Sequence, residues 1–252
     1  MSDFERFVEF DRRRARALAT RTEPFEHGVA LFRDELPLSY DRNMLSVDLD
    51  TDADAAVLSA AADRLQGAAK LLHRKVAVDG PLGARLAEGF RALGWQVVEL
   101  VVMCHDGRAL DGSGAEEVGP EEVEPFWAEG IRRDHGDDAE LVRQLVAAQH
   151  ARREATTVRY FAARGGDGRV VSACELFSDG RTAQVESVQT FEEHRGRGLG
   201  RAVVSAAVSA AQAAGDERVY IVADAADWPG DWYRRLGFEP IGSIWDFLQR
   251  PT

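Results

Sequence analysis

Hydrophobic residues recur along the chain either at helical spacing or in the alternating or continuous runs of strands. The changes between these patterns divide the first part of the chain into predicted helices and strands. Apolar residues at helical spacing predict helices near 3–20, in the alanine-rich run ADAAVLSAAADRLQGAAKLL and through LGARLAEGFRAL. Alternating or continuous apolar runs predict strands near 26–34 and 43–49, in KVAVD and in WQVVELVVM. The first part is therefore expected to alternate between helices and strands.

The polar segment HDGRALDGSGAEEVGPEE, residues 105–122, has no apolar period and is the best candidate for a boundary. Helices are expected after it near 121–132 and 138–154. Three successive strands are then predicted, joined by short turns: TVRYFAA, RVVSACELF and AQVESVQTF. A helix through RAVVSAAVSAAQAA, a strand RVYIVAD, a helix through DWYRRL and a strand FEPIGSIWDFLQ follow. An antiparallel meander that continues into strand–helix–strand predicts a mixed α+β fold.

The two parts of the chain end in similar patterns. FRALGW at 90–95 matches YRRLGF at 233–238, and each lies between a helix pattern and a strand pattern. One interpretation is an internal duplication with a diverged first copy. The other is that any helix ending in Leu-Gly before a strand looks like this.

Composition and charge narrow the class of protein. The 252 residues are 45% hydrophobic and 29% charged, which is typical of a globular protein, and no apolar run of membrane-spanning length or signal-peptide pattern is apparent. Two cysteines indicate no disulfide framework and favour a cytoplasmic location. A net charge of −12 argues against broad nucleic-acid binding and is compatible with a cationic substrate or with ordinary solubility.

The stretch EEHRGRGLGRAV, residues 192–203, places three glycines on alternate positions among three arginines. It stands between a predicted strand and a predicted helix, where the first helical amides have no intrahelical partner. Glycines let the backbone adopt positive φ and let a ligand approach closely, while arginines add positive charge. This turn is therefore a candidate diphosphate site.

The spacing excludes two common phosphate motifs. No Lys-Ser or Lys-Thr follows, as a P-loop requires, and the glycines do not fit G-x-G-x-x-G of dinucleotide-binding folds. The pattern that fits is Arg195-x-x-Gly198-x-Gly200. RLQGAA at 64–69 fits a similar pattern, but it lies inside a predicted helix and not at a strand-to-helix turn.

VQTFEEHRGRGLGRAVV resembles the acetyl-CoA-binding motif of the GNAT acyltransferase superfamily, and YRRLGF is similar to the Tyr-x-x-x-Gly-Phe that follows it in that family. The resemblance covers roughly residues 115–252. It implies a GNAT fold, α+β, with a mixed and mostly antiparallel central sheet flanked by helices. A second, smaller GNAT-like α/β half would precede it, giving a degenerate N-terminal domain at 1–108 and a catalytic domain at 109–252.

The resemblance also implies residue roles. The backbone of one strand would bind the pantetheine arm, and the glycine turn would bind the pyrophosphate, while that strand and the next separate around the thioester. The cofactor-binding residues would be Val188, Gln189, Thr190, Arg195, Gly196, Arg197, Gly198, Leu199, Gly200 and Arg201. Tyr233 takes the position of the family's general acid. No metal is expected.

An amine acceptor also needs a base, because a protonated amine cannot attack a thioester. Glu186 is the first candidate, and strand alternation predicts that it shares a face with Val188 and Thr190. Asp224 and Asp227 follow the next strand, although Asp227 could equally cap the following helix. Ala226 stands where the family commonly has an asparagine, so the resemblance does not assign that cofactor contact to this chain.

The N-terminal half lacks these groups. Phe90 occupies the place of Tyr233, and Asp50, Asp52 and Asp54 stand where the phosphate turn would be and suit a helix N-terminus. This half is expected to shape the acceptor site or an interface and not to catalyse.

The leading hypothesis is an acetyl-CoA-dependent N-acetyltransferase that transfers an acetyl group directly to an amine in a ternary complex. The alternative is an inactive acyl-CoA-binding regulatory or scaffold protein. The expected partners are acetyl-CoA and an unidentified amine, with no nucleic acid and no membrane. The acyl chain length and the oligomeric state stay open, a homodimer being one option.

Overall fold

The computed structural model describes residues 1–227 and 229–250, and its elements follow the predicted order. The α-helices are α1 (Asp3–Leu18), α2 (Ala55–Ala68), α3 (Pro81–Ala92), α4 (Pro120–His135), α5 (Ala139–Ala151), α6 (Leu199–Ala214) and α7 (Pro229–Arg235). The strands are β1 (Arg21–Phe25), β2 (Gly28–Phe32), β3 (Met44–Val47), β4 (Arg74–Asp79), β5 (Gln96–His105), β6 (Glu116–Val118), β7 (Thr157–Arg164), β8 (Val170–Ser178), β9 (Thr182–Thr190), β10 (Arg218–Asp224) and β11 (Phe238–Gln249). The short 3-10 turns are η1 (Tyr40–Arg42), η2 (Arg152–Glu154) and η3 (Glu192–His194).

All of these strands form one sheet in the order β1-β2-β3-β4-β11-β5-β10-β9-β8-β7-β6. The pairs β3–β4 and β9–β10 are parallel and the other pairs are antiparallel, so the predicted mixed, mostly antiparallel sheet is confirmed. The sequence did not reveal β1 or β6, because both strands are short and have no apolar period. β1 contains a proline, and β6 adds to the outer edge of β7.

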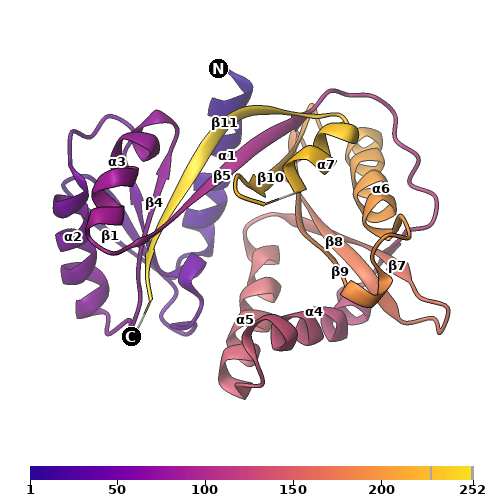
Figure 1. Ribbon diagram of the computed structural model, residues 1–252, viewed down its shortest axis with the longest axis horizontal. Helices are drawn as coiled ribbons and strands as arrows, with labels where there is room; N and C mark the ends of the chain where they lie inside the picture. Colours follow the sequence, from indigo (N-terminus) through magenta and orange to yellow (C-terminus); the bar gives the residue numbers. More distant parts are fainter. Residues whose placement is uncertain (228, 251–252) are drawn as a thin grey trace.

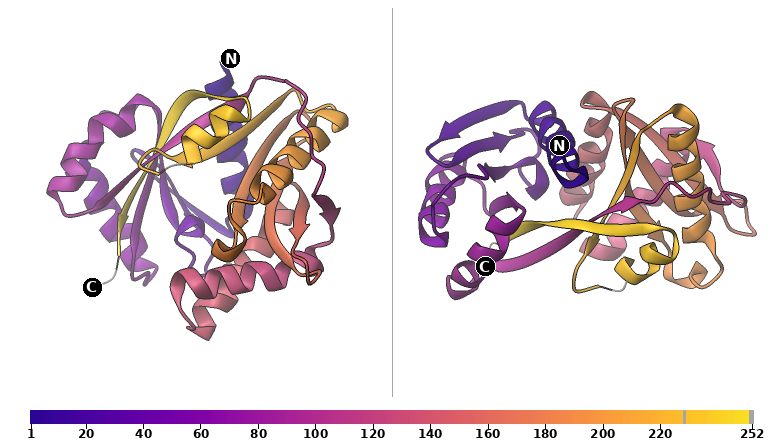
Figure 2. Two further views of the ribbon diagram at one scale, coloured as in Figure 1. Left: turned by 45° about the vertical axis from the view of Figure 1, so that its right-hand side comes forward. Right: turned by 90° about the horizontal axis from the view of Figure 1, so that it is seen from above.

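The centre of the sheet is built from strands of both halves. The C-terminal strand β11 lies between β4 and β5, and β5 of the N-terminal half lies between β11 and β10 (Figure 1). Seen from above, β5 and β11 run side by side from one half of the molecule into the other (Figure 2). Each half therefore contributes a strand to the other half's part of the sheet.

The similarity of FRALGW to YRRLGF corresponds to similar local structure. Phe90 lies 5.0 Å from Trp95 between ring centroids, and Tyr233 lies 6.0 Å from Phe238. The glycine in each motif has positive φ and ends the helix before a strand. Around each motif the order is strand, helix, strand, and the strand before each helix pairs with the strand that follows the other helix.

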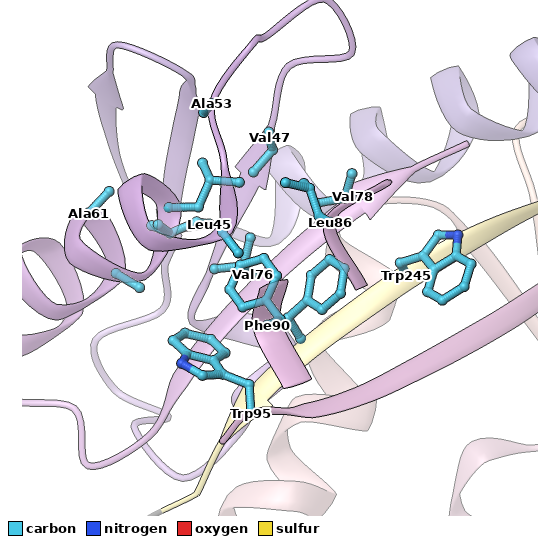
Figure 3. Packing of buried hydrophobic residues seen from close by; sticks show 14 of the residues in the cluster. Leu45, Val47, Ala53, Ala61, Val76, Val78, Leu86, Phe90, Trp95 and Trp245 are labelled. Atoms are coloured by element: carbon cyan, nitrogen blue, oxygen red, sulfur yellow. The ribbon is translucent and has the colours of Figure 1, made fainter. Parts of the chain in front are cut away.

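Helices cover both faces of the sheet. On one face of β5, Val97 packs into the core beneath α2 and α3, and Met103 packs into the core beneath α6 and α7. On the other face, Val102 and Cys104 pack against α1. The helices α4 and α5 lie on the same face as α1, next to a separate cluster that includes Phe126 of α4. Figure 3 shows Trp245 of β11 beside Phe90 and Leu86 in the N-terminal core.

Several details of the sequence analysis are confirmed locally. The second glycine pattern, RLQGAA, lies in and just after α2, away from any strand-to-helix turn. Asp54 caps α2, because its carboxylate accepts the amide N–H of Val57 at 2.9 Å. No helix in the described ranges is long and apolar enough to cross a membrane.

Candidate active site

The glycine turn connects β9 through η3 to α6. Gly196 and Gly198 have φ of 74° and 81°, a region that other residues rarely adopt, and Gly198 is the N-cap of α6. A Cβ atom on either glycine would meet no atom within 4 Å, so this side of the turn is open. The first amides of α6 are therefore available to an incoming anion.

The turn forms one wall of a cavity of about 430 Å³, which we name the glycine-loop cleft. Its lining residues are Val188, Gln189, Thr190, His194, Arg195, Gly196, Gly198, Leu199, Gly200, Arg201, Trp232 and Tyr233. The cleft thus brings together the residues proposed from sequence for the cofactor, with the exception of Arg197, and places Tyr233 beside them.

Two arginines of the turn donate to backbone oxygens and not to carboxylates. The guanidinium of Arg195 donates to the carbonyl oxygen of Thr190 at 3.1 Å, and that of Arg197 donates to the carbonyl oxygen of Glu193 at 3.2 Å. Within the described part of the chain, neither of these arginines nor Arg201 forms an ion pair, although ion pairs with carboxylates are common elsewhere on this acidic protein. Three free cations beside helical amides favour an anion with more than one charge.

The two strands beside the cleft separate. Thr182–Val185 of β9 pairs in parallel with Arg218–Ile221 of β10. Beyond these residues the two strands are no longer paired with each other, although both continue. In β9, Ser187 and Val188 lie opposite the single residue Cys174 of β8, so β9 contains a bulge. Ser187 has a positive φ of 54° in this bulge. The bend leaves the backbone of Val188–Thr190 without a partner strand on the β10 side.

The bulge changes which way Glu186 points. Val185 and Val188 both pack into the core beneath α6, whereas Glu186 lines a cavity on the opposite, α1 face of the sheet. The expectation that Glu186 shares a face with Val188 and Thr190 is therefore wrong. Side chains alternate between the two faces only along a regular strand. After the one extra residue of the bulge, each side chain points to the face opposite to the one that alternation predicts.

Glu186 lies in a second cavity, of about 290 Å³, which we name the inter-half cleft. Residues of α1, η1 and β4 in the N-terminal half line it together with residues of β8, β9, β10 and β11. Its charged lining residues are Asp11, Arg14, Asp41, Arg42, Lys75, Asp79, Arg152, Glu186 and Asp246. The two clefts lie on opposite faces of the sheet and meet β9 two residues apart, at Glu186 and at Val188.

Tyr233 is 6% exposed and packs in the core beneath α6. Burial, and after it the nearby charge of Glu186, raise the pKa of its hydroxyl above the ordinary value. The phenol therefore keeps its proton at neutral pH and can act as a hydrogen-bond donor in the glycine-loop cleft.

The other candidate bases are placed differently. Asp224 is exposed, and its carboxylate accepts the amide N–H of Ala226 at 2.8 Å. Asp227 is also exposed, and neither aspartate lines one of the two clefts. The residue between Asp227 and α7 lies outside the described residues, so the predicted cap at Asp227 stays a prediction.

The site contains groups that sequence patterns did not indicate. Ser172 of β8 hydrogen-bonds with the hydroxyl of Thr190 at 2.8 Å, and Arg152 donates to the hydroxyl of Ser187 at 2.8 Å beside the bulge. Arg42 of η1 and Arg14 of α1 enter from the N-terminal half. No local sequence pattern distinguishes Arg14, Arg42 and Arg152 from the other arginines of the chain.

Residues 156–240 match the family described as acetyltransferase (GNAT) domain. This segment of the C-terminal half is therefore similar to GNAT domains. The match begins just before β7, contains the glycine turn and Tyr233, and ends early in β11. The resemblance to the GNAT superfamily is thereby confirmed. Comparison with curated proteins gives no match.

Solved structures share the fold of both halves. A functionally unknown conserved protein from Staphylococcus epidermidis has a TM-score of 0.70 at 15% identity, over 91% of this chain and 93% of that one. A GCN5-related N-acetyltransferase from Kribbella flavida has a TM-score of 0.64 at 19% identity, over 99% and 96%. One from Sphaerobacter thermophilus has a TM-score of 0.59 at 16% identity, over 89% and 77%. At sequence identities this low, the similarity to these three structures shows a shared fold only.

Proposed function

We propose that this GNAT protein is an acetyl-CoA-dependent N-acetyltransferase that transfers the acetyl group directly to an amine. The observation that carries the proposal is the glycine-loop cleft, in which Arg195 and Arg201, without ion pairs in the described chain, lie beside free helix amides. A diphosphate suits these donors. The same cleft ends at a buried, protonated Tyr233 beside the gap between β9 and β10.

The residues of the cleft divide the binding of acetyl-CoA between them. The amides from Gly196 to Arg201 would donate to the pyrophosphate, and the arginines would add charge. The unpaired backbone of Val188, Gln189 and Thr190 can bond to the amides of the pantetheine arm, as an added strand would. The side chain of Gln189 lies against Gly130 of α4, so this residue would contribute its backbone.

Glu186 and Tyr233 would handle the protons of the reaction. Glu186 accepts the proton that the ammonium group loses, since only the neutral amine attacks. The amine nitrogen then bonds to the acetyl carbon while the carbon–sulfur bond breaks, and Tyr233 donates a proton to the departing sulfur. The nitrogen loses its second proton as the amide forms, and that proton returns to the Tyr233 phenolate and restores the phenol. Placement of the two groups on opposite faces of the sheet lets the amine arrive from the inter-half cleft and the thioester from the glycine-loop cleft.

Calorimetric titration with acetyl-CoA tests the site. We expect the double variant Arg197→Glu, Gly198→Asp to lose binding, because it places two negative charges and a side chain where the pyrophosphate would lie. The matched control is Gly180→Asp, Arg181→Glu, which makes the same changes at another glycine of positive φ, in the turn between β8 and β9. Undiminished affinity in the first variant would refute the location of the site.

Release of the CoA thiol in the presence of an amine tests turnover. An enzyme releases thiol with at least one amine, and Glu186→Gln lowers that rate. Binding of acetyl-CoA without thiol release for any amine would favour the inactive acyl-CoA-binding protein.

A further inference from the structure

The charged groups of the inter-half cleft are almost all paired. The pairs are Arg14 with Asp11 at 2.7 Å, Arg12 with Asp79 at 2.6 Å, Lys75 with Asp246 at 2.7 Å and with Asp41, and Arg152 with Glu175. Such pairs hold the walls of the cleft and leave little net charge for a ligand.

Arg42 is the exception among the cations. It ends η1, between β2 and β3, and in the described chain it forms no ion pair. Its Nε is buried and has no hydrogen-bond acceptor among the described residues. Burial, together with the charge of Arg152, lowers the pKa of Arg42 to about 10, so that it stays protonated at neutral pH. A guanidinium with a buried and unused donor is costly unless an anion completes it.

Glu186 is the exception among the anions. It accepts a hydrogen bond from the side-chain amide of Gln184 at 2.6 Å, but it forms no ion pair within the described residues. The cleft therefore presents one free positive and one free negative charge, each from a different half of the chain.

We infer that the acceptor is a small amine that also carries a carboxylate, with the carboxylate on Arg42 and the amine directed toward Glu186. This inference rests on the proposed function and names its substrate class. A planar carboxylate matches a guanidinium in geometry and in charge. A dianionic phosphate fits less well, because Asp11, Asp41 and Asp79 line the same cavity. The volume of about 290 Å³ is at the lower end for small-molecule sites.

A panel of matched acceptors tests the inference. The probes are β-alanine, γ-aminobutyrate, L-methionine and L-phenylalanine, each compared with its decarboxylated counterpart: ethylamine, propylamine, 3-(methylthio)propylamine and phenethylamine. Thiol release gives kcat/KM for each. We expect at least one amino acid to exceed its counterpart by roughly 10- to 100-fold, the usual effect of a hydrogen bond to a charged group.

The variant Arg42→Gln should abolish that preference by raising KM for the amino acid, while kcat/KM for the decarboxylated amine stays near that of the wild type. A merely structural role of Arg42 would lower both values together and would overturn the inference. The control is Arg64→Gln, which changes an exposed arginine of α2.

Equal rates for both members of every pair, or no turnover of any amino acid in the panel, also overturn the inference. The proposed function is judged separately, by acetyl-CoA binding in the calorimeter and by turnover of the decarboxylated amines. A failure of the inference can therefore be distinguished from a failure of the proposed function.

Discussion

A single hydroxyl group distinguishes the corresponding aromatic residues of the two halves. Phe90 packs against Phe247 at 4.1 Å between ring centroids in the N-terminal core, and Tyr233 takes the same local position beside Phe238. Only Tyr233 borders the glycine-loop cleft. The same helix-end motif therefore serves packing in one half and, in our proposal, proton donation in the other.

Replacement of Tyr233 by Phe removes the donor and keeps the buried ring. We expect kcat to fall about 100-fold or more, the usual contribution of a general acid, while the Kd for acetyl-CoA changes little. Because the pKa of Tyr233 is raised, its proton is lost only above the ordinary value of about 10, so wild-type kcat should not fall from Tyr233 ionisation between pH 8 and 10. Thiol-release kinetics across pH measure both effects, and an unchanged kcat in the variant would contradict the role.

At the scale of elements, helix α3 approaches strand β11 through a glycine. A Cβ atom built on Gly83 would overlap the indole ring of Trp245, which is 8% exposed, so the helix can pack on this strand only without a side chain there. The contact joins an element of the N-terminal half to β11, whose Trp245 is labelled in Figure 3.

The variant Gly83→Ala should therefore destabilise the protein, although alanine favours a helix. Overpacking of a core typically costs about 1–3 kcal/mol, which exceeds the gain of about 0.5–1 kcal/mol in helix propensity. The control is Gly166→Ala, at a turn glycine with no atom within 4 Å of the added Cβ. Urea unfolding measures both, and equal stability of the two variants would show that Trp245 moves aside freely.

At the scale of the whole molecule, the exchange of strands makes each half incomplete alone. A fragment ending at residue 108 would lack β11 between β4 and β5, and a fragment beginning at residue 109 would lack β5 between β10 and β11. Trp245 and Phe247 of β11 also complete the N-terminal core, and buried Lys75 of β4 pairs with Asp246 of β11. The boundary near residue 108 thus separates two halves that share one sheet.

We expect the fragments 1–108 and 109–252 to be unfolded or aggregated when each is produced alone, because unpaired strands and apolar surface would be exposed. Coexpression should yield a folded complex that binds acetyl-CoA. Circular dichroism and gel filtration of the purified fragments check this. A stable, monomeric 1–108 fragment would show instead that the N-terminal half does not need β11.

Much of this protein follows from local patterns in the sequence. Apolar periodicity determined most helices and strands, because burial of one face repeats every 3.6 or 2 residues. The glycine turn was also readable, since positive φ at Gly196 and Gly198 requires glycine and free helix amides follow from the backbone itself.

Only the tertiary structure decided which distant segments meet. The positions of β5 and β11 depend on pairing between strands more than 130 residues apart, as between Leu100 and Ile244, and no local pattern encodes that choice. The bulge at Ser187 placed Glu186 on the face opposite Val188, because one extra residue inverts strand alternation. Arg42 likewise became a candidate binding residue only when folding buried it in a cleft where the neighbouring carboxylates pair with other cations.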